Sequence, residues 1–205
     1  MTGSFDRTLD RFALAGAQFE QRLRTVRAQQ WALPTPCAEW TVRDLVNHMA
    51  QGNLNYVGLA AGGTGAQFLR SRGEDALGSD PVGAYVRSVR QCAEAFAEPG
   101  ALHRVLDYPL GPVTGAQALA VRTTDSVIHT WDLARAVGAD ERLDPGLVAW
   151  IEAESDAIYA GLAETPADPD TTHRFFAAPE GSPAADASRQ ERLLHRMGRT
   201  VERGG

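Results

Sequence analysis

Apolar side chains recur at helical spacing in four long segments of this 205-residue chain, and no set of strands large enough for a sheet accompanies them. The four segments span residues 9–30, 42–59, 81–98 and 116–137. Each is apolar along one face, which must be buried against other helices before the chain is stable. The fold class is therefore predicted to be all-α, an antiparallel four-helix bundle.

Residues typical of helix ends support these boundaries. Thr41, followed three residues later by Asp44, is close to a capping box at the start of the second helix. Asp80 and Pro81 have the order of an N-cap and a first helical residue at the start of the third. Gly138 is suited to the position just past the end of the fourth.

The segments around these helices carry other patterns. Residues 60–80 are rich in glycine and are expected to form a loop or a frayed helix end. Residues 102–108 alternate in polarity and are expected to form an extended arm or a hairpin. A fifth helix is predicted over residues 147–162, and a last short helix over residues 188–198.

The length and the hydrophobic content of 43% suffice for one domain with a substantial core. We expect residues 1–163 to form the bundle and residues 164–205 to form a C-terminal extension that packs on it, not an independent domain. The net charge of −6 argues against nucleic acid as a partner. No apolar run of about 18 residues is present, so a cytoplasmic protein without membrane contact is predicted. Cys37 and Cys92 are expected to be reduced thiols.

An acidic residue four positions before a histidine marks a candidate metal site, because the two side chains lie one turn apart on one helix face. The chain has three such pairs, which are Asp44 and His48, Asp125 and His129, and Glu191 and His195. With 26 acidic residues and 5 histidines, this number exceeds chance, and surroundings must distinguish the pairs. The second pair stands among apolar residues, where a buried acid needs a partner. Asp125 and His129 are therefore predicted to bind a metal.

His48 lies on the apolar face of the second predicted helix, where an isolated histidine is most often a hydrogen-bonded core residue. Beside Asp125 and His129, it becomes a third candidate ligand. Two imidazoles and one carboxylate leave open positions for water or a substrate atom, as in catalytic metal sites. Zinc suits this ligand set, and nickel, iron and manganese fit it too. A bound water or thiol would become a nucleophile at neutral pH.

Two charged neighbours leave alternatives open. Asp132 is placed to accept the second N–H of a ligand histidine and fix its orientation. It is equally placed to form a salt bridge with Arg135 or Arg122. Arg122 stands three residues before Asp125, so it is also a candidate to pair with that carboxylate and to compete with a metal.

Two motifs carry a family resemblance. Residues 35–48 (TPCAEWTVRDLVNH) and 125–138 (DSVIHTWDLARAVG) resemble the two signatures of the DinB-like metal-binding proteins related to mycothiol-dependent maleylpyruvate isomerase. Residues 187–194 resemble the end of the short actinobacterial members. The resemblance implies a DinB-type four-helix bundle in which two histidines and an acid hold a divalent metal. The matching positions are His48, Asp125 and His129.

The chain departs from that family's characterised isomerase in two respects. The isomerase carries glutamate at the position of Asp125, and an added C-terminal domain gives an arginine to its active site. We expect the present chain to be too short for that domain. The arginines that stand as candidate substitutes are Arg174, Arg189, Arg192 and Arg196.

The function implied is that of a metal-dependent enzyme. The ion binds the sulfur of mycothiol or another low-molecular-weight thiol, and the thiolate attacks a small electrophilic molecule, with transfer or isomerisation as the result. The alternatives are a metal-binding module without catalysis and a hydrolase that uses metal-activated water. The expected partners are the substrate and the thiol, and the resemblance is compatible with a homodimer.

Overall fold

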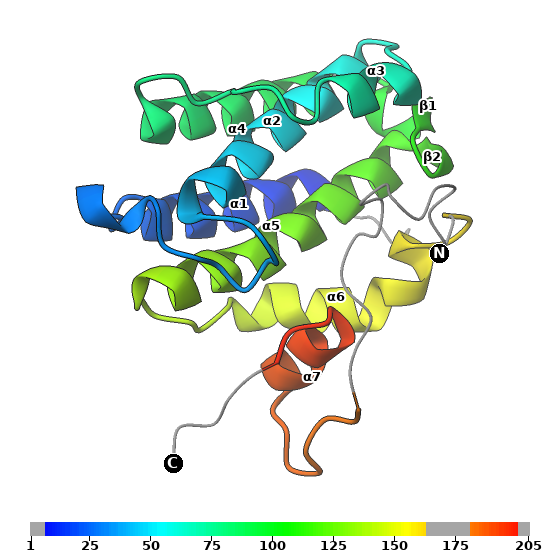
Figure 1. Cartoon of the computed structure of the whole chain (residues 1–205). Coiled ribbons are helices and arrows are strands. Elements are labelled where there is room, and N and C mark those ends of the chain that lie inside the picture. Colours follow the sequence, from blue (N-terminus) through cyan, green and yellow to red (C-terminus); the bar gives the residue numbers. More distant parts are fainter. Residues whose placement is uncertain (1–6, 163–180, 201–205) are drawn as a thin grey trace.

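The computed structural model describes residues 7–162 and 181–200, in which four long helices form a bundle (Figure 1). These helices are α1 (Thr8–Leu23), α2 (Val42–Ala60), α4 (Pro81–Ala97) and α5 (Gly115–Val137). Helix α1 packs against α4 and α5, and α2 packs against the same two helices. The predicted all-α four-helix bundle is confirmed.

Helices α1 and α5 run in one direction, and α2 and α4 run in the other (Figure 1). The parallel course of α2 and α4 arises because residues 61–80 return along the bundle between them. The sequence predicts a loop or a frayed helix end here, and the structure adds the short helix α3 (Gly65–Arg70). Thr64 begins α3, since its side-chain oxygen accepts a hydrogen bond from the Gln67 backbone N–H at 3.2 Å.

A two-stranded antiparallel hairpin joins α4 to α5. It consists of β1 (Val105–Tyr108) and β2 (Gly111–Thr114), with Tyr108 opposite Gly111, and follows the 3₁₀ turn η2 (Ala101–His103). Of the two forms expected for residues 102–108, the hairpin is therefore the correct one. It places Tyr108 beside the end of α2, where its hydroxyl accepts a hydrogen bond from Tyr56 at 3.1 Å.

The prediction of one helix over residues 9–30 is wrong at its end. Helix α1 stops at Leu23, and a 3₁₀ turn, η1 (Ala28–Gln30), follows after a break. The break occurs because the Thr25 hydroxyl and backbone N–H both bond to the Arg22 carbonyl, at 2.7 and 2.9 Å. Local side-chain bonding thus ends a helix that the apolar period would continue.

Two further helices lie on the outside of the bundle. Helix α6 (Pro145–Ile158) packs on α5, and α7 (Arg189–Arg196) packs on α6, as the two remaining predicted helices (Figure 1). The predicted division of the chain after residue 163 falls at the start of residues 163–180, outside the described residues, and stays a prediction.

Helix α5 is buried over most of its length because α1, α2 and α6 surround it. Its buried hydroxyl side chains are satisfied within the helix by bonds to carbonyls four residues earlier. The donors are Thr123, Thr124, Ser126 and Thr130, at 2.7 to 3.1 Å. Its charged side chains at positions 122, 125 and 132 form ion pairs instead, both within α5 and with residues of other segments. None of the described helices is long and apolar enough to cross a membrane.

Candidate metal centre

The three predicted ligands meet between α2 and α5. His48 Nε2 lies 3.3 Å from Asp125 Oδ2, and His129 Nε2 lies 3.2 Å from Asp125 Oδ1. The candidate donor atoms of all three residues lie within 4.8 Å of one another. Donors about 2.1 Å from a tetrahedral zinc ion are about 3.4 Å apart, so the separations fit one divalent ion.

The other acids of the three acid–histidine pairs serve as helix caps. Asp44 accepts the Thr41 backbone N–H at 2.9 Å, which completes the predicted capping box at the start of α2. This hydrogen bonding by Thr41 lowers the pKa of Asp44. Glu191 caps α7 in the same way, by accepting the Ser188 backbone N–H at 2.6 Å. Neither acid is therefore part of a metal site.

Arg122 is paired with Asp125, as the competing hypothesis allowed. The side chain is 2% exposed, and its Nη1 forms an ion pair with Asp125 Oδ2. Its other nitrogens donate to the Met49 carbonyl at 2.6 Å and to Asn53 Oδ1 at 2.8 Å. Arg122 thus satisfies one oxygen of the carboxylate, whereas the other oxygen faces His129.

Gly52 makes room for this guanidinium. A Cβ at Gly52 would lie 2.8 Å from Arg122 Nη1 and 3.0 Å from Arg122 Cζ, closer than real side chains approach. The glycine therefore matters for a close approach across the α2–α5 interface and not for backbone freedom.

Gly52→Ala is expected to destabilise the protein by about 1–3 kcal/mol, because the added methyl group displaces a buried, hydrogen-bonded arginine. Urea unfolding would measure the change. Gly58→Ala is the matched control: it lies in the same helix, and a Cβ there would meet nothing within 4 Å. The control should be neutral or stabilising by up to about 1 kcal/mol, because alanine favours helix. Equal effects at both positions would contradict the packing role of Gly52.

Asp132 lies against His129, as the first of its foreseen roles requires, and that role at a bound metal stays a prediction. Its Oδ2 lies 2.8 Å from His129 Nδ1, which leaves Nε2 of the ring directed at Asp125. The alternative partners of Asp132 are engaged elsewhere, since Arg122 binds Asp125 and Arg135 pairs with Glu141 at 3.3 Å. Asp132 is 0% exposed, so this carboxylate orients the imidazole from within the core.

Two residues that the sequence did not single out complete this side of the centre. Arg199 binds both oxygens of Asp132, through Nε at 2.8 Å and Nη2 at 2.7 Å. Cys37 Sγ lies 3.3 Å from Asp132 Oδ2, 3.5 Å from Arg199 Nη2 and 3.7 Å from His129 Nδ1. Cys37 therefore stands beside a histidine that lies 92 positions away in the sequence. Asp132 contacts all three of the other residues, which are His129, Cys37 and Arg199.

Of the four arginines expected as substitutes, the three that the structure describes lie away from the candidate ligands. Arg189 and Arg192 lie against Glu152, at 3.2 and 3.7 Å. Arg196 is exposed, and Arg174 lies outside the described residues. Among the described arginines of the C-terminal part, the one at the centre is Arg199, which follows the last predicted helix and so carried no periodic signal.

Burial and charge set the protonation of the ligands. Burial lowers the pKa of His48 to about 4, although Asp125 opposes the shift, so this imidazole is neutral at pH 7. Burial alone would raise the pKa of Asp125, but the charges of His129 and Arg122 hold it well below its usual range. Burial alone would lower the pKa of His129, but Asp125 and Asp132 hold it well above 6.5. A metal would therefore have to displace a proton from His129.

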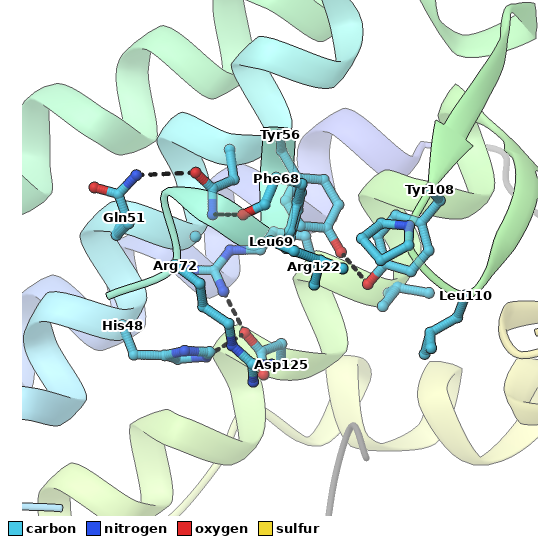
Figure 2. Close-up of a pocket in the computed structure, with 14 residues that line it drawn as sticks. His48, Gln51, Tyr56, Phe68, Leu69, Arg72, Tyr108, Leu110, Arg122 and Asp125 are labelled. Carbon is cyan, nitrogen blue, oxygen red and sulfur yellow. Dashed lines mark hydrogen bonds and ion pairs between the residues drawn. The ribbon is translucent and has the colours of Figure 1, made fainter. Parts of the chain in front are cut away.

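A pocket of about 80 Å³ opens onto His48 and Asp125 (Figure 2). Its walls come from α2, the α3 segment, the hairpin and α5. The polar lining residues beyond the ligands are Gln51, Asn55, Tyr56, Arg72, Tyr108 and Arg122, and the apolar ones include Phe68, Leu69 and Leu110. Trp40 packs against both histidines, with its ring centroid 4.8 Å from that of His48 and 6.0 Å from that of His129. The arrangement offers a small molecule access to the ligand cluster.

Comparisons with known proteins identify the family of this chain. The family described as the mycothiol maleylpyruvate isomerase N-terminal domain matches residues 12–134, a range that contains all three candidate ligands. Two uncharacterised proteins from strains of Mycobacterium tuberculosis are each 34% identical over 183 residues, which is 89% of this chain and 92% of theirs.

Two solved structures are similar in fold. They are the crystal structures of a mycothiol-dependent maleylpyruvate isomerase and of a histidine-to-alanine mutant of that enzyme. Both give a TM-score of 0.58 and cover 75% of this chain and 72% of theirs, at 17% and 16% identity.

Proposed function

Because the chain belongs to the mycothiol maleylpyruvate isomerase N-terminal domain family, we propose that it is a metal-dependent enzyme that uses a low-molecular-weight thiol. The family and the structural relatives point to mycothiol as the thiol. The observation that carries the proposal is the meeting of His48, Asp125 and His129 at ligand distances beside a pocket. The proposed metal is zinc, and nickel, iron or manganese also suit the donor set.

The charges around the centre favour an anionic ligand. Asp125 is neutralised by Arg122, and Asp132 is neutralised by Arg199. Once a metal has displaced the proton from His129, both histidines are neutral. The two positive charges of a divalent ion would then have no counter-charge among these side chains. A divalent ion bound here would keep a coordinated thiol deprotonated at neutral pH.

The pocket suits a small electrophile. Phe68 and Leu110 offer apolar contact, and Arg72 and Gln51 offer polar contact, so these side chains would bind and orient the substrate next to His48. The thiolate sulfur would add to an electrophilic carbon of a double bond, and the π electrons would move to the conjugated end of that molecule. In an isomerisation those electrons return, the carbon–sulfur bond breaks and the double bond re-forms, so the thiol is regenerated. In a transfer the electron pair instead takes up a proton, the carbon–sulfur bond remains and the thiol is consumed.

Metal content tests the proposal directly. Protein purified without chelator or nickel affinity should contain about one equivalent of metal by elemental mass spectrometry, and His48→Ala and His129→Ala should lose it. His103→Ala is the matched control, because His103 is exposed on η2 and should leave the metal in place. A wild-type protein that is purified without metal and then fails to bind zinc or nickel in titration would overturn the proposal.

A metal-binding module without catalysis is the second candidate. The Arg122–Asp125 pair would keep such a module folded in its metal-free form, because it satisfies the carboxylate without an ion. Turnover of electrophiles that requires added thiol would support the enzyme. Metal binding without any turnover would support the module, and hydrolysis without thiol would indicate a metal-activated-water mechanism.

A further inference from the structure

Arg199 reaches the centre from the segment that follows α7. It is 8% exposed and forms a two-pronged ion pair with Asp132, which is fully buried. Its remaining nitrogen, Nη1, donates to the Met197 carbonyl at 3.0 Å, which fixes the plane of the guanidinium. A bidentate pair with a third anchor holds the carboxylate in one orientation more firmly than a single contact would.

The end of α7 directs Arg199 towards the bundle. Gly198 has a φ of 67°, a left-handed conformation that glycine adopts without strain. The backbone N–H of Arg199 bonds to the Leu194 carbonyl and that of Gly198 to the His195 carbonyl, both at 2.9 Å. These two bonds form a Schellman motif, which reverses the chain at the helix end. The reversal turns Arg199 towards Asp132.

The contact continues from Asp132 to the ligand histidine. Asp132 Oδ2 accepts from Arg199 Nη2 at 2.7 Å and lies 2.8 Å from His129 Nδ1. The opposite nitrogen of the same ring, Nε2, lies 3.2 Å from Asp125 Oδ1 in the ligand cluster. The orientation of the carboxylate therefore sets the direction in which Nε2 points.

We propose that Arg199 is a positioning residue of the metal centre, which orients His129 through Asp132 and makes the segment after α7 part of the site. This inference rests on the proposed metal site. Mutation of a group that hydrogen-bonds the other ring nitrogen of a ligand histidine lowers metal affinity by about 10- to 100-fold. Arg199 acts one contact further away, so we expect its loss to cost about 10-fold.

Zinc titration against a chromophoric chelator tests the inference on the full chain. Arg199→Met should weaken zinc binding about 10-fold. Arg199→Lys keeps the positive charge but cannot contact both oxygens of Asp132 as a guanidinium does. The zinc affinity of this variant should therefore lie between those of the wild type and Arg199→Met. Arg189→Met is the matched control, because Arg189 lies on α7 and pairs with Glu152 at 3.2 Å without touching Asp132. It should bind zinc as the wild type does.

A double-mutant cycle separates positioning from general stabilisation. In an Asp132→Ala background, Arg199→Met should have little further effect on zinc affinity, because its path to His129 is already absent. An undiminished effect in that background would overturn the inference. Metal-free unfolding curves would report any loss of stability separately.

The outcomes distinguish this inference from the proposed function. Wild-type zinc affinity in Arg199→Met would overturn the positioning role and leave the metal site intact. Absence of zinc binding in the wild type would overturn both. If Arg199→Met fails to fold, the zinc affinity of Arg199→Lys tests the inference instead. Wild-type zinc affinity in Arg199→Lys would contradict the role of the two-pronged contact.

Discussion

Asp125→Asn is expected to abolish metal binding while the bundle remains folded. The amide has the shape of the carboxylate, and its oxygen can still accept a hydrogen bond from Arg122. The buried Arg122 therefore keeps a hydrogen-bond acceptor. It lacks the negative charge, however, and leaves two neutral imidazoles as the remaining protein donors. We expect zinc affinity to fall by more than about 100-fold, because even partners behind the ligands are worth about 10- to 100-fold. Titration and metal content would measure the loss.

Asp125→Glu is the control for this prediction. It keeps the carboxylate and lengthens the side chain by one methylene group, and the family resemblance places a glutamate at this position. We expect it to retain bound metal. Equal zinc affinity in Asp125→Asn and the wild type would show that Asp125 is not a ligand and that its ion pair with Arg122 is its whole role.

Arg122→Leu is expected to destabilise the metal-free protein by about 3–5 kcal/mol, the cost of breaking a buried ion pair from one side. The loss removes the guanidinium from Asp125, whose side chain is 16% exposed, and leaves His129 as its cationic neighbour. It also leaves Asn53 Oδ1 and the Met49 carbonyl without the Arg122 donor. Zinc should stabilise this variant more than it stabilises the wild type, because the ion supplies the missing positive charge. Urea unfolding with and without zinc would measure both effects.

Arg135→Leu provides the matched control for Arg122→Leu. Arg135 lies on the same helix and pairs with Glu141, but about a third of each side chain is exposed to solvent. Its removal should cost no more than about 1 kcal/mol, with no dependence on zinc. An equal loss for the two arginines, or an Arg122→Leu variant that zinc stabilises no more than the wild type, would contradict the role of Arg122 as counter-charge.

The sequence was sufficient for the parts of the centre that lie on regular helices. The capping pair of Thr41 and Asp44 placed the start of α2, so His48 could be assigned to a buried helix face. Asp125 and His129 followed from their separation of one turn, and Asp132 followed in the same way. Helical geometry converts spacing in the chain into proximity, so the sequence was enough to predict that these side chains lie close together, and metal binding by them stays a prediction.

Cys37 and Arg199 were not predicted as residues of the site, because neither lies within a regular helix. Cys37 lies in a proline-containing connection and Arg199 follows a helix end, so no period relates either residue to α5. Their contacts with Asp132 span 95 and 67 positions and exist only after packing. The early end of α1 was missed because the Thr25 hydroxyl competes for a carbonyl in a segment whose apolar period continues.

The candidate ligands and the outer wall of the pocket belong to different kinds of structure. His48, Asp125 and His129 stand on long packed helices, whereas Phe68, Arg72 and Tyr108 come from the excursion between α2 and α4 and from the hairpin. Connections accept insertions and exchanges that a packed helix does not. Divergence among relatives can therefore alter the shape of the pocket more readily than it alters the helices that carry the three candidate ligands.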